Sequence, residues 1–272
     1  MSIERAVATL SASDVRAQLR TAHYGHSLRL LDETSSTNDQ AKRDAQSGAV
    51  RGHTVVADMQ HAGRGSQGRV WSSPKGLDLY VSIVDRPAVS FADLPPLTLA
   101  VGLGVSDAVD TLLGRPRSQV KWPNDVWIDR KKCAGILIEA SASGSTLDSV
   151  VIGIGLNVNR ADFPDDLAKS ATSLRLANDE RAAIARSDAL STLLFHVETW
   201  VERFVARGPS ALIEPLEARL AMRGERARCS ESIGVVRGIS ASGALRFQTA
   251  EGVHEVVSGR LLPLDEAYEG LA

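Results

Sequence analysis

Three glycines and two arginines lie within the seven residues from Gly63 to Arg69, and Trp71 closes the segment. Glycine lets a ligand approach the backbone closely, and its free N–H groups form a concave nest for an anion. The guanidinium group of arginine adds a planar fork of donors that suits a carboxylate or a phosphate. The composition therefore predicts a loop that holds an anion, with a mobile surface loop as the alternative.

The spacing of Gly63, Gly65 and Gly68 also matches G-x-G-x-x-G, but its context excludes the common meanings of that pattern. A dinucleotide-binding loop opens a helix, whereas Trp71-Ser-Ser-Pro74 and a strand-like run follow here. A protein-kinase loop requires H-R-D and D-F-G motifs downstream, and the sequence contains neither. The other motifs of the sequence must therefore indicate which ligand the loop binds.

A second cluster of chemically active side chains is Val120-Lys-Trp-Pro-Asn-Asp-Val126. The proline fixes its own φ and biases the preceding tryptophan toward an extended conformation. One cation, Lys121, one amide, Asn124, and one carboxylate, Asp125, are therefore held on a stiff backbone within five residues. Ordinary turn chemistry, in which Asn and Asp follow proline, is the alternative interpretation.

The segment Ser149–Asn159 alternates its side chains as a strand with two different faces does. Apolar residues occupy one face, while the other carries Gly153, Gly155, Asn157 and Asn159. The apolar face belongs in the core. Because glycine weakens a strand interior, the two glycines indicate a ligand or a close backbone approach. We expect room there for a flat ring, with Asn157 placed to read its edge.

Polar residues also gather at Glu33-Thr-Ser-Ser-Thr-Asn38, between a predicted strand at 27–31 and a predicted helix at 39–46. One Ser, Thr or Asn of this group is needed to cap the helix. The remaining hydroxyls and the amide are free to face a polar ligand. Gln60 follows a predicted strand at 54–58 and precedes residues 63–69, which we call the Gly/Arg loop. We therefore expect Gln60 close to this polar cluster.

The rest of the chain supplies the elements that position these clusters. A strand is expected at 77–83, and helices are expected at 14–20 with Ser13 as cap, 94–113 ending at Gly114, 180–207, and after Gly208-Pro209 as far as 222. A hairpin is expected with its turn at 129–132, a solvated tip, and its return strand at 134–139. After Gly224, short strands with turns every 8–12 residues or so predict a small β-barrel. We therefore expect a catalytic domain at 1–222, with a short extension at 1–25, and a C-terminal domain at 223–272.

Composition and charge limit the class of function. The 272 residues carry a net charge of −2, which argues against broad electrostatic capture of nucleic acid. The two cysteines, Cys133 and Cys229, lie far apart and indicate neither a disulfide framework nor a zinc site. The sequence shows no signal peptide and no run long enough to span a bilayer, so we expect a cytoplasmic protein.

Together and in this order, the clusters resemble those of biotin–protein ligases, also called biotin–[acetyl-CoA-carboxylase] ligases. The resemblance rests on Ser36-Thr-Asn38, Gln60 with Gly63-Arg-Gly65, Lys121-Trp-Pro-Asn-Asp125, Lys132 with Ala134-Gly-Ile-Leu-Ile-Glu139, and Gly153-Ile-Gly-Leu-Asn157. It covers the chain from about residue 27 to the C-terminus. The K-W-P-N-D and G-x-G-x-N blocks are specific in combination, although each alone is a weak signal.

The resemblance implies an α/β (α+β) fold of the class II synthetase-like type, a mixed β-sheet with helices packed on one side, followed by a small SH3-like β-barrel. It also implies a two-step reaction. The biotin carboxylate attacks the α-phosphate of ATP and gives biotinyl-5′-AMP and pyrophosphate. A lysine amine of a biotin carboxyl carrier domain then attacks the adenylate and AMP leaves. ATP and Mg²⁺ are the implied cofactors, biotin the substrate, and a monomer or homodimer the implied assembly.

The resemblance also assigns site residues. The implied biotin-binding residues are Ser36, Thr37, Asn38, Gln60, Arg64, Gly65, Ser66, Lys132 and Gly135. The implied nucleotide-binding residues are Arg69, Trp71, Lys121, Asn124, Gly155 and Asn157. The implied catalytic residues are Lys121, Arg64, Asp125 and Lys132. Adenylation joins two anions and so needs positive charge and positioning rather than a protein nucleophile. We expect no dedicated metal cage, because Mg²⁺ arrives with ATP, near Asp125.

Two alternatives remain, a lipoate–protein ligase and a non-catalytic biotin-sensing protein. The ordered blocks favour biotin, and sensing alone would not require a phosphate-facing cation such as Lys121. The N-terminal DNA-binding module of repressor-type members is not visible, and the C-terminal strands lack basic–aromatic interleaving. We therefore expect a ligase without a nucleic-acid or membrane partner.

The family loop usually reads G-R-G-R-x-G-R, and Ser66 stands where that pattern has its second arginine. Serine forms a hydrogen bond but offers no charged fork, so the reactive adenylate should be held less firmly unless Arg69 or Lys131 compensates. We predict that Ser66→Arg slows the dissociation of biotinyl-AMP, measured by chasing labelled adenylate from the protein. Equal dissociation rates in the native protein and the variant would refute this hypothesis.

Overall fold

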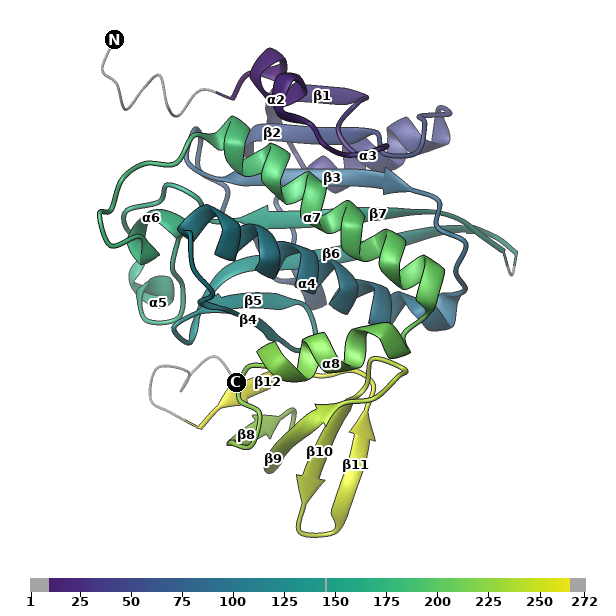
Figure 1. The fold of residues 1–272 in the computed structure, drawn as a ribbon, viewed down its shortest axis with the longest axis vertical. Helices are drawn as coiled ribbons and strands as arrows, with labels where there is room; N and C mark the ends of the chain where they lie inside the picture. Colours follow the sequence, from purple (N-terminus) through teal and green to yellow (C-terminus); the bar gives the residue numbers. More distant parts are fainter. Residues whose placement is uncertain (1–9, 145, 265–272) are drawn as a thin grey trace.

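The computed structural model describes residues 10–144 and 146–264, which form a seven-stranded mixed sheet and a five-stranded antiparallel sheet (Figure 1). The order of strands in the larger sheet is β1-β2-β3-β7-β6-β5-β4. Strands β1 and β2 are parallel, and the other neighbours are antiparallel. These strands are β1 (Leu28–Thr34), β2 (Thr54–Gln60), β3 (Leu79–Asp85), β4 (Ser118–Lys121), β5 (Asp125–Ile128), β6 (Lys131–Ser143) and β7 (Thr146–Leu156).

Helices cover both faces of the larger sheet, and the two longest lie side by side on one of them (Figure 1). The helices of the described chain are α2 (Ala12–Gln18), α3 (Thr37–Gln46), α4 (Leu94–Leu113), α5 (Asp165–Ala168), α6 (Leu174–Ala177), α7 (Arg186–Arg207) and α8 (Ser210–Arg219), with 3₁₀ turns η1 (Ser66–Gly68) and η2 (Phe91–Asp93). Ile152 and Ile154 pack into the main core with α4 and α7, whereas Val151 packs on the opposite face against Ala41 of α3. The expected mixed-sheet α/β fold is confirmed, whereas the expectation of helices on one side alone is wrong, because α3 packs on the second face.

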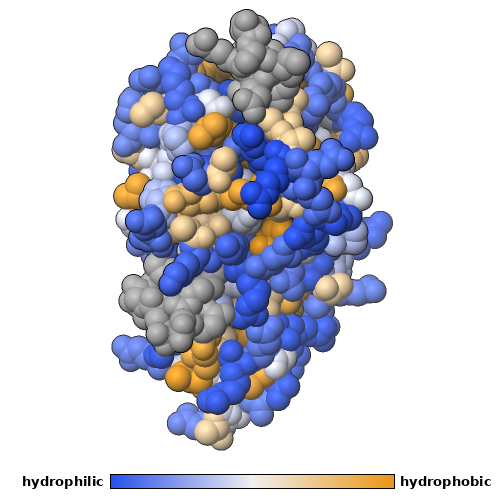
Figure 2. All heavy atoms as spheres, turned by 90° about the vertical axis from the view of Figure 1, so that its left-hand side faces the viewer, coloured by the Kyte–Doolittle hydropathy of each residue, from blue (hydrophilic) through white to orange (hydrophobic). Residues whose placement is uncertain are grey.

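Helix α4 is long and apolar enough to resemble a membrane-spanning helix. The segment Phe91–Leu113 has the length and hydropathy of a membrane span, but 67% of its most apolar window is buried inside the protein. It lies beside α7 on one face of the larger sheet (Figure 1), and most of its residues are buried. Figure 2 looks onto the side that carries α5 and α6, and hydrophilic side chains cover most of that face. The apolarity of α4 is therefore explained by its place in the core.

The smaller sheet lies at the C-terminal end of the molecule, with strand order β11-β10-β9-β8-β12 (Figure 1). Its strands are β8 (Arg226–Cys229), β9 (Ser232–Ile239), β10 (Leu245–Thr249), β11 (Gly252–Val256) and β12 (Leu261–Pro263). The indole Nε1 of Trp122, which is 1% exposed, donates to the carbonyl of Gly243 at 3.0 Å. A Cβ on Gly243 would meet the backbone of Pro96 at 2.8 Å, so glycine permits this close docking. The sheet is consistent with the expected SH3-like domain.

Two predicted helix starts are wrong. Helix α2 begins at Ala12, and Ser11, rather than Ser13, caps it through its hydroxyl. Helix α7 begins at Arg186 rather than near residue 180. The side chain of Asn159 accepts from the backbone N–H of Ile184 at 2.8 Å, and this long-range bond holds the preceding segment in an irregular path. The expected end of α4 at Gly114 is confirmed, with a left-handed φ of 70°.

We predict that glycine is required where α4 crosses α7. A Cβ at Gly104 would lie 2.7 Å from the Cα of Val197, whereas one at Gly102 would meet only a Val120 methyl at 3.3 Å. Both Gly→Ala changes gain the same helix propensity. Gly104→Ala should therefore be less stable than Gly102→Ala by about 1–3 kcal/mol, the cost of overpacking. Chemical denaturation of both variants measures the difference, and equal stabilities would contradict the prediction.

Candidate active site

Three cavities meet at the Gly/Arg loop. We call two of them the inner cavity (about 40 Å³), which lies around Thr37 and Gln60, and the outer cavity (about 190 Å³), which lies around Asp125 and Asn157. The third, the interdomain cavity (about 220 Å³), lies between Trp122 and the segment 257–260. Ser66 of η1 lines all three. Lys132 stands between the inner and outer cavities, and Lys121 between the outer and interdomain cavities. The candidate residues from distant parts of the sequence are therefore brought to one place.

The inner cavity is lined by hydrogen-bonding groups at the N-terminus of α3. The side-chain oxygen of Gln60 accepts from the backbone N–H of Thr37 at 2.9 Å and from its hydroxyl at 3.1 Å. The hydroxyl of Ser82 donates to Asn38 Oδ1 at 2.6 Å, and Asn38 Nδ2 donates to Glu139 at 2.7 Å. Ser36 occupies the N-cap position but its side chain makes no cap bond. The polar groups are thus fixed by one another and oriented before any ligand arrives.

Two side chains cover the glycine face of β7 that the sequence predicts to be bare. A Cβ on Gly153 would lie 2.3 Å from Asn38 Oδ1, and a Cβ on Gly155 would lie 2.3 Å from the indole of Trp71. The expectation of a close approach is correct, but in this structure the approaching groups are protein side chains. The indole Nε1 of Trp71 is buried without a hydrogen-bond partner among the described residues. Trp71 separates the inner cavity from the outer one.

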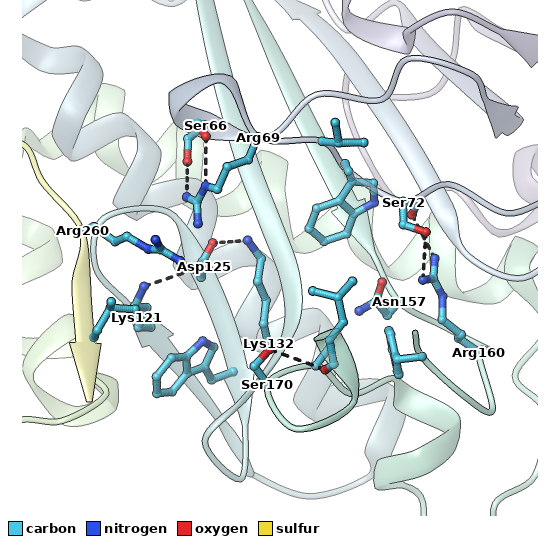
Figure 3. A pocket seen from close by; sticks show the side chains of 18 residues that line it. Ser66, Arg69, Ser72, Lys121, Asp125, Lys132, Asn157, Arg160, Ser170 and Arg260 are labelled. Atoms are coloured by element: carbon cyan, nitrogen blue, oxygen red, sulfur yellow. Dashed lines mark hydrogen bonds and ion pairs between the residues drawn. The ribbon is translucent and has the colours of Figure 1, made fainter. Parts of the chain in front are cut away.

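The centre of the site is a buried carboxylate between two lysines (Figure 3). Asp125 Oδ1 lies 2.6 Å from Lys132 Nζ, and Oδ2 lies 3.4 Å from Lys121 Nζ. Asp125 and Lys121 are 4% and 5% exposed. Burial alone would raise the pKa of Asp125, but Lys132 and Lys121 overcome that effect and lower it to about 2. Burial lowers the pKa of Lys121, and Asp125 opposes this shift only in part.

The two arginines of the loop point to different partners. Arg64 pairs with Asp39 of α3 at 2.7 Å and with Glu139 at 3.1 Å, so it closes one side of the inner cavity. Arg69 folds back and donates to the hydroxyl of Ser66 at 2.9 Å, within the outer cavity. Lys131, the other suggested substitute for the missing second arginine, is exposed and lines none of the three cavities.

The structure places the other candidates as follows. The inner cavity is lined by Ser36, Thr37, Asn38, Gln60, Arg64, Gly65, Ser66, Asn124, Lys132, Gly135 and Gly155. The outer cavity is lined by Arg69, Trp71, Lys121, Asp125 and Asn157. Asn124 and Gly155, expected at the nucleotide, therefore lie at the inner cavity. Asn157 lies just beyond the end of β7, not within a strand reaching 159, and donates to the carbonyl of Thr172 at 2.9 Å.

Sequence reasoning missed two arginines of the outer cavity, Arg160 and Arg260. Arg160 is 4% exposed and pairs with the fully buried Asp78 at 2.7 Å. It also donates to the carbonyl of Ser72 at 2.9 Å, which ties the segment after Trp71 to the end of β7. Arg160 follows the Gly153–Asn157 block within three residues, so its position in the sequence was a usable signal, whereas Arg260 comes from a segment without any predicted site residue.

The described residues contain no cluster of three or more His, Cys, Asp or Glu side chains that could hold a metal ion. Asp125 contributes one carboxylate to the outer cavity, and both its oxygens already face lysines. A single carboxylate suits a magnesium ion that is carried mainly by the phosphates of a nucleotide.

Known proteins resemble this chain in sequence. Residues 30–157 match the model of the biotin/lipoate A/B protein ligase family. The chain is 36% identical to a bifunctional ligase/repressor BirA of Bacillus spizizenii over 92% of its own length and 78% of that protein. It is 32% identical to a biotin–[acetyl-CoA-carboxylase] ligase of Paracoccus denitrificans, over 89% of this chain and all of that one.

Solved structures agree with these relatives. A biotin protein ligase from Aquifex aeolicus in complex with biotin and ATP superposes with a TM-score of 0.76 at 30% identity, covering 87% of this chain and 97% of that one. Sequence and structure therefore lead to the same result: the chain belongs to the biotin–protein ligases of the biotin/lipoate A/B protein ligase family.

Proposed function

We propose that the three joined cavities carry out both steps of ATP-dependent biotin–protein ligation. The observation that carries this proposal is the concentration of positive charge where the cavities meet. Lys121, Lys132, Arg69 and Arg260 line the outer cavity together with one carboxylate, Asp125. Biotin carboxylate and ATP are both anions, so the reaction needs such a cluster to bring them together.

In the first step, the inner cavity holds biotin and the outer cavity holds ATP. The fixed hydroxyl and amide groups of Thr37, Asn38 and Gln60 match a ureido ring, which both donates and accepts hydrogen bonds. Lys132 then lies where the biotin carboxylate meets the nucleotide. A carboxylate oxygen attacks the α-phosphorus, the bond to the bridging oxygen breaks, and pyrophosphate leaves. Lys121 and Arg69 balance the charge that develops on the phosphate oxygens.

The second step needs a neutral amine at the acyl carbon of the adenylate. We assign this amine to a lysine of a biotin carboxyl carrier domain. The amine nitrogen forms the new amide bond, the acyl–oxygen bond breaks, AMP leaves with that oxygen, and the proton that the nitrogen loses passes to the departing phosphate or to water. Asp125, with a pKa of about 2, is too weak a base to remove the proton at neutral pH. Its role is therefore to hold Lys121 and Lys132 in place and to orient the amine.

Several features complete this proposal. Mg²⁺ enters with ATP, because the outer cavity offers it one carboxylate at most. The catalytic domain comprises residues 1–222, and the SH3-like domain comprises 223–272. The chain works in the cytoplasm, where biotin, ATP and the carrier meet. The lipoate-specific alternative is not favoured, because the relatives described above are biotin ligases.

We predict that the protein releases pyrophosphate from ATP when biotin, but not lipoate, is added, and that label then passes to a carrier domain. Lys121→Met should lower kcat/KM for ATP by about 100-fold, because it removes one buried cation from the transition state. Thr111→Ala, on the exposed end of α4, is the control and should be unaffected. Biotin binding without pyrophosphate release would leave only a sensing function, and release with lipoate alone would change the substrate.

The buried charges predict a dependence on pH. The pKa of Lys121 is lowered in the folded protein, so its ammonium group loses a proton at a lower pH than a free lysine does. KM for ATP should therefore rise toward alkaline pH. Asp125→Asn removes the charge that opposes this shift, and the rise should move to lower pH. The control Asp129→Asn, in the exposed turn after β5, should leave the profile in place, and an unshifted profile for Asp125→Asn would contradict the assignment.

A further inference from the structure

The C-terminal sheet supplies a cation to the active site. Arg260 immediately precedes β12, and its side chain points into the outer cavity beside Asp125 and below Arg69 (Figure 3). It also lines the interdomain cavity, which continues from the outer cavity past Lys121. Arg260 therefore brings a charged side chain from the C-terminal sheet to the outer cavity.

Two contacts fix the position of Arg260 relative to the rest of the site. The hydrogen bond from Trp122 to Gly243 ties the C-terminal sheet to the residue next to Lys121. The backbone carbonyl of Arg260 accepts from the N–H of Ser230 at 2.9 Å. The first bond holds the C-terminal sheet against the segment that carries Lys121, and the second holds the backbone of Arg260 within that sheet. Together they keep the guanidinium group of Arg260 at the site.

Within residues 10–144 and 146–264, the guanidinium group of Arg260 forms no ion pair of its own. Its Nε is buried without a hydrogen-bond partner among the described residues. Burial and the neighbouring Arg69 lower the pKa of Arg260, and Asp125, already shared by two lysines, opposes them only in part. The described residues that line the interdomain cavity include three cations, Arg69, Lys121 and Arg260, and no carboxylate. Such a set favours a ligand with several negative charges.

The geometry of phosphoryl transfer indicates which anion this is. The attacking and leaving oxygens stand roughly in line on opposite sides of the phosphorus. Biotin arrives through the inner cavity, on the side of Lys132, while Lys121 and Arg260 stand at the opening of the interdomain cavity. Figure 3 shows Lys132 and Lys121 on different sides of Asp125. Of the two cavities that Lys121 and Arg260 line, only the interdomain cavity offers a leaving polyphosphate cations without a competing carboxylate among its described lining residues.

We propose that Arg260 binds the β- and γ-phosphates of ATP and that the interdomain cavity receives the pyrophosphate. This inference rests on the proposed function. It makes Arg260 a phosphate-binding residue of the first half-reaction, with no part in the second, because the triphosphate is gone when the acceptor lysine attacks. The competing occupant of the same cavity is that lysine, whose ammonium form three cations would repel.

The test is biotin-dependent exchange of labelled pyrophosphate into ATP, measured on the full chain with Arg260→Met, Arg260→Lys and the native protein. Loss of one charge-assisted contact should raise KM for pyrophosphate and for ATP by roughly tenfold or more. Arg260→Lys should restore part of the affinity. The biotin Kd, and the transfer rate from preformed biotinyl-AMP to a carrier domain, should stay as in the native protein. Arg246→Met is the control, since Arg246 is exposed on β10 and lines none of the three cavities.

Three outcomes would overturn the proposal. An unchanged KM for pyrophosphate in Arg260→Met would remove the contact. Slowed transfer with normal exchange would assign the cavity to the acceptor lysine. Equal loss in both half-reactions, without rescue by Arg260→Lys, would make Arg260 a structural residue. If Arg260→Met does not fold, Arg260→Lys against the native protein still measures the KM for pyrophosphate. Absence of exchange in the native protein would instead refute the proposed function itself, so the two failures are distinguishable.

Discussion

The site depends on one buried carboxylate that holds two lysines apart and in place. Asp125 is almost fully removed from water, and such burial strongly disfavours an isolated charge. Its oxygens at 2.6 Å and 3.4 Å from Lys132 and Lys121 keep it ionised and keep both ammonium groups aimed at the outer cavity. One anion for two cations leaves net positive charge, which is what a phosphate-binding site requires. A second carboxylate here would neutralise both lysines, and no net positive charge would be left for the phosphates of the substrate.

A bulge in the hairpin brings the second lysine to that carboxylate. The pairing of β5 with β6 runs from Val126 opposite Ala134 directly to Trp127 opposite Lys132, so one residue of β6 is extra. Without that shift, the alternation of a strand would place Cys133 opposite Trp127 and turn Lys132 to the other face. The bulge therefore decides that Lys132 belongs to the site and that Cys133 is buried.

Features encoded in one segment could be predicted from the sequence, whereas register shifts and long-range contacts could not. Helix α4 was predictable because Pro95 and Gly114 mark its ends through local backbone chemistry. The Gly/Arg loop, the Lys121–Asp125 segment and the glycine face of β7 were recognisable from residue type alone. The hairpin pattern alone places Lys132 at a solvated tip, since a register shift leaves no local mark, and only the family resemblance assigns it to the site. Trp71 on Gly155, and the approach of Arg260 from the other domain, are long-range contacts that no single segment encodes.

The surplus charge also links ligand binding to the stability of the protein. Without a phosphate ligand, Arg69, Lys121, Lys132 and Arg260 repel one another around a single carboxylate, and this repulsion is least screened at Lys121, the one of the four that is buried. The polar contacts of the inner cavity and the Trp122–Gly243 contact hold the framework against it. An anion that binds the native state alone relieves the repulsion and stabilises the fold. The two sheets meet at this cluster of cations, so an anion that binds there stabilises the contact between the sheets as well as the cluster itself.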